Sequence, residues 1–191
     1  MVETSFSLLE RLRLSSDPAA WQRLVELYTP YIQGWLRRQS VQSADVEDLT
    51  QEVLRSVVRA LPDFQHDLRR GAFRRWLRTI TVNHLRSFWR ARRPQTLSEE
   101  AGQLLDRLED PASDLSRLWD EEHDRHVVRR LLELIQSEFE PNTWRAFHLV
   151  VLEGRSAGEA AAELGISANA ARIAKSRVLA RLRQESDGLI D

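Results

Sequence analysis

The chain has 191 residues, of which 42% are apolar and 30% charged, enough for a core beneath a strongly charged surface. This length suits one large domain or two small ones. Because the sequence contains no cysteine, it excludes disulfides and thiolate metal sites. No stretch of about 18 apolar residues and no signal-like apolar run occurs, so we expect a soluble, cytoplasmic protein.

The net charge of −1 conceals blocks of opposite charge. Residues 69–93 hold nine arginines and no acid, and residues 172–183 hold five basic residues and no acid. Between these two blocks, residues 99–124 hold ten acids against two arginines. Only Lys175 among the 28 basic residues is a lysine. A GC-rich genome explains this ratio as well as phosphate binding does, but it does not explain the clustering.

Helical periodicity runs through almost every segment and predicts an all-α protein. A first helix is expected from near Thr4, and a second after the start signal Ser16-Asp17-Pro18. Apolar residues at steps of three and four predict a third helix over 44–61 and a fourth over 72–92. Four helices that share an apolar side predict a bundle.

Pro94 interrupts this pattern, and an acidic stretch follows. We expect a linker over residues 95–112, with a short helix from Ser98 to Leu108. Helix resumes near Ser113, another helix begins at Glu140-Pro141, and two short ones follow Gly154. The predicted organisation is therefore two helical domains, 1–94 and 113–191, joined by the acidic linker.

Residues 156–183 carry the clearest local motif. Ser156 and Glu159 form a capping box, and Gly165 supplies the residue that a sharp helix stop needs. Ile166 packs under the turn and Ser167 caps the next helix. The pattern predicts a helix-turn-helix, whose second helix enters the major groove of DNA. The inward residues of that helix are Ala171, Ala174, Val178 and Leu182.

The outward side of the same helix carries donors suited to base edges. Arg and Lys can donate to guanine and Asn can pair with adenine, although a helical hairpin with a solvated basic face gives the same pattern. The candidate DNA-binding residues are Asn169, Ala170, Arg172, Lys175, Ser176 and Arg177.

A second informative segment is the helix over 44–60. Asp45, Asp48 and Glu52 are three and four residues apart and share one face, with Gln51 beside them. Acids in the first turns also suit the helix dipole. This face can serve as a docking surface, a solvated helix start or, less suitably without a nearby histidine, a metal site.

The combined motifs resemble the extracytoplasmic-function sigma factors. The residues Asp45, Asp48, Leu49, Gln51, Glu52 and Val53 match a D-x-x-D-L-x-Q-E-V helix of region 2 in that family. An F-R-x-W-L-x-x-I-x-x-N pattern follows over residues 73–83, and K-S-R-V-L-A-R-L-R, which ends at Arg183, is similar to region 4. The resemblance covers nearly the whole chain in the order and spacing of the family.

The resemblance implies a role for each segment. Asp45, Asp48, Gln51 and Glu52 would dock on the coiled-coil clamp helices of the largest polymerase subunit. The helix-turn-helix would bind the −35 element, and the arginine-rich helix would face the −10 element. The −10 candidates are Arg74, Arg75, Arg78, Asn83, Arg86, Trp89, Arg90 and Arg93. Trp76 and Phe88 are expected in the core.

Two positions depart from the pattern of the family. Ser87 stands where an acid is common, which leaves the detail of the −10 contacts open. Ala170 and Ala171 stand where Thr and Val are frequent, so the −35 sequence is not predicted.

The acidic block over 99–124 has three interpretations. It is a solvated linker, or it threads a polymerase channel, as the resemblance implies. As a third alternative, it folds against the arginine helix and masks it in the free protein. His123 and His126, one turn apart, suit surface positions better than a metal site.

We therefore predict a sigma factor that binds core RNA polymerase and promoter DNA, while catalysis belongs to the polymerase. No nucleophile–base set, phosphate-binding glycine loop or pair of catalytic carboxylates is found, so we expect no enzyme and no cofactor. An anti-sigma factor or a regulatory kinase acting at Thr50 or Ser56 would be a further partner. The alternatives are a stand-alone helix-turn-helix regulator that binds operators without polymerase, and a protein-interaction module.

Overall fold

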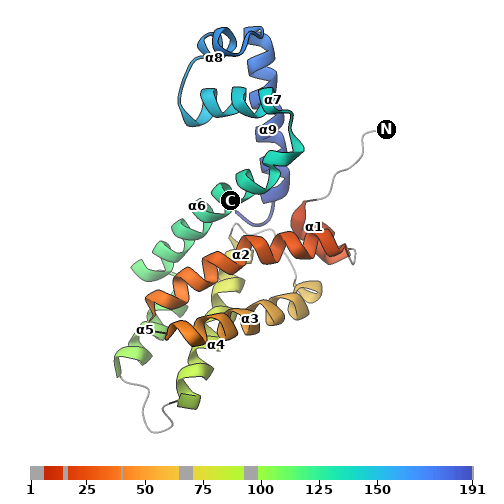
Figure 1. Cartoon of the computed structure of the whole chain (residues 1–191). Helices are drawn as coiled ribbons and strands as arrows, with labels where there is room; N and C mark the ends of the chain where they lie inside the picture. The colour runs from red at the N-terminus through yellow and green to blue at the C-terminus, as the bar shows by residue number, and fades with distance from the viewer. Residues whose placement is uncertain (1–6, 15–16, 40, 65–70, 93–98, 191) are drawn as a thin grey trace. The chain divides into compact units, whose positions relative to one another are not determined.

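The computed structural model describes residues 7–14, 17–39, 41–64, 71–92 and 99–190. Every named element within these ranges is a helix, which confirms the predicted all-α class (Figure 1). The chain forms two compact units, whose main segments are Phe6–Val127 and Val128–Ser186. None of the described helices has the length and apolar character of a membrane span.

Four helices form the first part of the larger unit: α1 (Leu8–Leu14), α2 (Pro18–Arg38), α3 (Ser43–Ala60) and α4 (Ala72–Arg92). Asp17 caps α2 by accepting a hydrogen bond of 3.0 Å from the backbone N–H of Ala19, as the start signal predicts. Apolar stripes on these helices meet in one core. Leu24, Ile32, Val53, Phe73 and Leu77 are fully buried in it.

The acidic segment is structured where it is described. Helix α5 (Glu99–Glu109) packs against α4 and buries Leu105 and Leu108, so its inner face is apolar although its composition is acidic. Helix α6 (Asp114–Ile135) follows and places Trp119 in the core of the larger unit. The compact units divide after Val127, within α6, and not at the predicted linker.

The smaller unit contains the end of α6, then α7 (Pro141–Phe147), a π-helical turn over His148–Leu152, α8 (Ala157–Leu164) and α9 (Ala168–Ser186). The capping box is present: the Glu159 N–H donates to Ser156 Oγ, and the Ser156 N–H donates to Glu159 Oε2. Gly165 ends α8 with φ of 65°, the left-handed region that favours glycine. Two helices joined by this tight turn form the predicted helix-turn-helix motif.

The inward side of α9 packs where the sequence places it. Val178 lies in a cluster with Ile135 and Phe147. Ala171 and Ala174 lie in a second cluster, against which Leu164 and Ile166 pack. These contacts fix which side of α9 remains for a partner.

Candidate nucleic-acid interface

The outer side of α9 is a polar, exposed surface. Asn169, Arg172 and Lys175 are exposed, as are Ser176 and Arg177, whereas Ala170 is half-buried. Residues 169, 172 and 176 follow one another at steps of three and four, opposite the buried Ala171, Ala174 and Val178. The structure therefore brings the predicted −35 candidates together on one side of one helix.

Several other arginines of the same unit are paired with glutamates. Arg145 contacts Glu153 and Glu163 at 3.1 Å each, and Arg155 also pairs with Glu163. Arg181 lies 2.6 Å from Glu138.

By contrast, Arg172, Lys175 and Arg177 have no carboxylate partner among the residues that the structure describes. Three exposed cations without internal partners on one helix side can bind phosphate or base edges.

A second basic surface lies along the exposed side of α4. Arg75, Asn83, Arg86 and Arg90 follow at steps of three, four and eight, which places them on one side of the helix. Asn83 and Arg90 are exposed, and Arg75 and Arg86 are half-buried. Arg86 lies 2.7 Å from Glu109 at the end of α5, and it donates a bond of 3.3 Å to Asn83 Oδ1. One carboxylate of the acidic block thus neutralises a residue of this surface.

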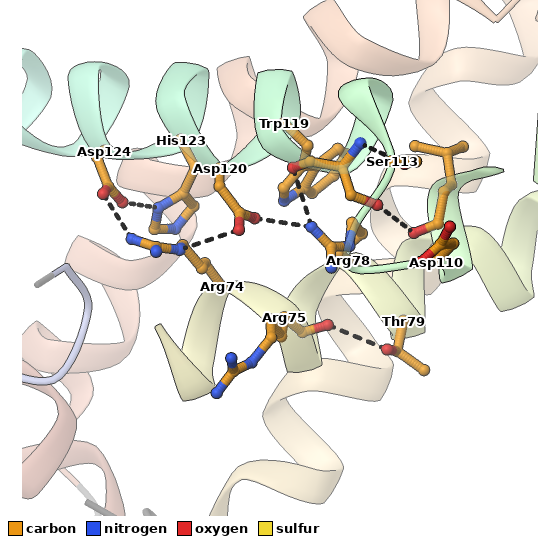
Figure 2. Close-up of polar contacts among 12 residues, drawn as sticks. Arg74, Arg75, Arg78, Thr79, Asp110, Ser113, Trp119, Asp120, His123 and Asp124 are labelled. Atoms are coloured by element: carbon orange, nitrogen blue, oxygen red, sulfur yellow. Dashed lines mark hydrogen bonds and ion pairs between the residues drawn. The ribbon is translucent and has the colours of Figure 1, made fainter. Parts of the chain in front are cut away.

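Arg74 and Arg78 have a different environment, and here the prediction needs a correction. Both point toward α6, as Figure 2 shows. Arg78 is 4% exposed and donates to Asp120 at 2.8 Å and to the backbone oxygen of Ser116 at 3.1 Å. Arg74 lies 2.6 Å from Asp124 and 3.4 Å from Asp120. Their guanidinium groups bind internal carboxylates and do not face solvent as a phosphate-binding pair.

Aromatic packing holds α6 in this position. Trp119 is 1% exposed and meets Tyr31 and Trp35 edge-on, with ring centroids 5.1 and 4.7 Å apart. A tryptophan buries about 200 Å², worth about 5 kcal/mol at 25 cal/mol per Å². Moving α6 away from α2 would expose that surface, so α6 stays beside the two arginines of α4. We therefore assign the arginine pair a structural role and leave it out of the DNA contacts.

A buried hydrogen-bonded chain extends the same cluster. His123, fully buried, contacts Asp124 through Nδ1 at 2.9 Å and the Tyr28 hydroxyl through Nε2 at 3.1 Å. Burial lowers the pKa of His123, although the hydrogen bond with Asp124 opposes the shift. Burial also raises the pKa of Tyr28 well above its usual value. A neutral His123 therefore donates a hydrogen bond from Nδ1 to Asp124 and accepts one at Nε2 from the Tyr28 hydroxyl.

Asp124 keeps its charge in this environment. Partial burial raises the pKa of Asp124, but the hydrogen bond with His123 and the charge of Arg74 outweigh burial and lower the pKa. His126 bonds instead to the backbone oxygen of Leu27 at 2.7 Å. No group of three or more metal-ligating side chains gathers in the described part of the chain. Both histidines thus have structural partners.

The aromatic candidates of α4 are distributed between core and surface. Trp76 is half-buried and packs on Phe64 and Phe73, with ring centroids 4.7 and 5.5 Å apart. Phe88 and Trp89 are also half-buried. Arg93 lies outside the described residues.

The predicted docking side of α3 is acidic and accessible. Asp48, Gln51 and Glu52 are exposed and Asp45 is half-buried, while Leu49, Val53 and Val57 are buried on the opposite side. Glu52 lies 3.6 Å from His84 of α4, and its side chain is still 56% exposed. The surface therefore presents carboxylates that a basic partner can reach.

The two modification candidates on α3 differ in access. Thr50 is 1% exposed and donates to the backbone oxygen of Val46 at 2.6 Å, so a kinase cannot reach it in this fold. Ser56 is half-buried and contacts His84 at 2.8 Å.

An acidic side of α3, a partly basic α4 and a helix-turn-helix thus occur in one chain. A model of the sigma-70 region 2 family matches residues 24–95. The RNA polymerase sigma factor CarQ of Myxococcus xanthus is 32% identical over 176 residues, which cover 92% of this chain and 94% of that protein.

The chain therefore belongs to the sigma-70 family and is a sigma factor of the extracytoplasmic-function type. It binds core RNA polymerase and promoter DNA and acts in promoter recognition and transcription initiation, which confirms the function predicted from the sequence. Sigma factors are regulatory subunits, and the polymerase carries out the catalysis.

Proposed function

We propose that this sigma factor divides its contacts among three helices. The acidic side of α3 docks on the polymerase, the exposed side of α4 binds the −10 element, and the outer side of α9 reads the −35 element. The observation that carries this assignment is the set of three exposed cations on the outer side of α9, which have no carboxylate partner among the described residues, whereas Arg145, Arg155 and Arg181 of the same unit pair with glutamates. A helix side that folding leaves positive suits a polyanion.

On α4, Arg75, Arg86 and Arg90 bind phosphates of the −10 element, and Asn83 pairs with an unstacked base. Phosphate contacts supply affinity without sequence information, whereas a flipped base needs a polar group and a stacking surface. Trp89, half-buried near the end of the helix, supplies that stacking surface.

On α3, Asp45, Asp48, Gln51 and Glu52 face basic residues of the polymerase. Charge complementarity of this kind fixes the register and raises the association rate more than it raises affinity. Binding to the polymerase places the protein in the cytoplasm. An anti-sigma factor is a suitable regulator, and a kinase acting at Ser56 would have to displace the contact with His84.

Run-off transcription with purified core polymerase on a pooled promoter library tests the proposal. The protein should produce discrete new start sites that share −10 and −35 elements. Asp48→Arg should abolish them. Glu121→Arg is the matched control, because it makes the same kind of charge reversal at an exposed acid of α6, outside the docking side of α3.

Equal loss with both charge reversals would reject docking through this side of α3. New start sites that do not change with Arg172→Ala would reject reading by α9. Tight operator binding without polymerase, and no transcripts with it, would identify a stand-alone regulator instead.

A further inference from the structure

Ile173 is an exposed apolar residue on the outer side of α9. It is 44% exposed, whereas Val178 and Ala171 on the inward side of the same helix are fully buried; elsewhere in this unit Leu152 is also exposed, at 53%. Asn169 lies four residues before it and Ser176 three residues after it, so the three share one side of the helix. Ile173 therefore stands in the middle of the polar surface proposed to read DNA.

Folding of the unit gives no reason for an isoleucine here. The inward positions of α9 are residues 171, 174 and 178, and Ile173 lies on the opposite side. A β-branched residue also has a lower helix propensity than alanine, because its side chain loses rotamer freedom.

Single exposed apolar residues are common on protein surfaces and need a second argument before they indicate a contact. The second argument is the position of Ile173 near the start of α9. α9 begins at Ala168, and the first residues of a recognition helix are the ones that contact base edges. The flanking Arg172 and Arg177 are exposed and have no carboxylate partner in the described part of the chain, so charged groups surround Ile173 without covering it.

We propose that Ile173 determines specificity by contacting the C5-methyl group of a thymine in the −35 element. The inference rests on the proposed function of α9. Thymine presents the one methyl group that the four bases expose in the major groove, and apolar side chains are its partners. Burying one methyl-sized group is worth about a fourfold change in binding.

Deoxyuridine, which differs from thymine only by the missing methyl group, provides the test. Holoenzyme binding to a −35 duplex is measured with each thymine replaced in turn by deoxyuridine, for the wild-type protein and for Ile173→Ala. At one position the replacement should weaken wild-type binding about fourfold, as one lost methyl contact requires. The Ile173→Ala protein should bind the two duplexes equally, and Ile173→Val should keep the sensitivity.

The same assay separates failure of this inference from failure of the proposed function. Arg172→Ala should weaken binding to every duplex; if it does not, α9 is not the reader. If Arg172→Ala weakens binding but no thymine position couples to Ile173, the inference is overturned and the reading by α9 stands. If Ile173→Ala weakened binding to all duplexes by the same factor, this side chain would contact the polymerase and not a thymine, and the inference would also be overturned.

Discussion

Arg78 and Asp120 lie 42 residues apart in the chain, yet a hydrogen bond of 2.8 Å joins their side chains. The bond connects α4 with α6, so a helix of the predicted first domain, 1–94, pairs with a helix that the sequence assigned to the second domain, 113–191. The two helices thus share one cluster of ion pairs. The contribution of this cluster to the stability of the larger unit can be measured separately from transcription.

Asp120→Asn should lower the free energy of unfolding of the larger unit by about 2 kcal/mol. Removing one partner of a buried ion pair costs roughly 3–5 kcal/mol, and the partial exposure of Asp120 reduces this value. Urea unfolding followed by tryptophan fluorescence measures it, since five of the six tryptophans lie in the larger unit.

Asp114→Asn is the control for that change, because its pair with Arg117 is exposed on both sides. Its effect should stay within about 0.5 kcal/mol. Equal effects of the two substitutions would mean that the pair of Arg78 and Asp120 contributes no more to stability than an exposed ion pair does.

Stability should fall when the pH drops below about 6.5, the ordinary pKa of histidine. The folded pKa of His123 is lowered by burial, so between the two pKa values the unfolded chain binds a proton that the folded chain does not. The unfolded state therefore gains stability with acid, and the urea midpoint at pH 5.5 should lie below that at pH 7.5.

His123→Asn tests the assignment, since an amide can still donate to Asp124 but does not titrate. This protein should be less stable at pH 7.5 and should lose much of the dependence between pH 5.5 and 7.5. His148→Gln, on the smaller unit, should leave the dependence unchanged. A wild-type slope that survives in His123→Asn would assign the effect to another histidine.

Glu109→Gln should increase the affinity of the free protein for single-stranded −10 DNA. Glu109 holds Arg86 at 2.7 Å, and without the carboxylate that guanidinium can bind a phosphate. We expect about a threefold gain at low salt, with a log–log salt slope steeper by up to about 0.7.

Glu133→Gln removes the same charge from a pair within α6, where Arg130 is its partner at 2.6 Å, and should have a smaller effect. Fluorescence anisotropy at several salt concentrations compares the two proteins. Unchanged affinity in Glu109→Gln would show that the acidic segment does not compete with DNA at Arg86.

The turn of the helix-turn-helix offers a matched pair of glycine substitutions. Gly165→Ala should destabilise the motif by about 1 kcal/mol, because φ is 65° while no atom lies within 4 Å of the added Cβ. Gly158→Ala, inside α8, should instead stabilise it by roughly 0.5 kcal/mol. Amide hydrogen exchange in α8 measures both changes in stability. If the two substitutions changed stability in the same direction, the role assigned to the turn would be contradicted.

Local signals in the sequence predicted much of this structure. The fourth helix was expected over 72–92 and spans Ala72–Arg92, and the capping box and Gly165 form as predicted. These features depend on neighbouring residues alone, so periodicity and capping rules suffice.

Those rules do not predict which helices, distant in sequence, pack against each other. Periodicity identifies a buried side of a helix but not the partner that covers it, and so α5 was read as part of a linker. Arg74 and Arg78 were likewise assigned to the −10 DNA, although folding of the acidic block against the arginine helix was one of the three interpretations of that block. One signal was available: these arginines and the pair Asp120 and Asp124 have the same spacing of four residues, which predicts two complementary helix surfaces.

The contact of Arg74 with two carboxylates also bears on why this chain uses arginine almost exclusively. A guanidinium presents several donors in a flat fork and can reach Asp120 and Asp124 together, whereas an ammonium is a single point charge. A lysine at this position could pair closely with only one of the two acids, and Asp120 would then depend on Arg78 alone if the lysine held Asp124. Among relatives, positions 74, 120 and 124 should therefore change together or not at all, whatever the base composition of the genome.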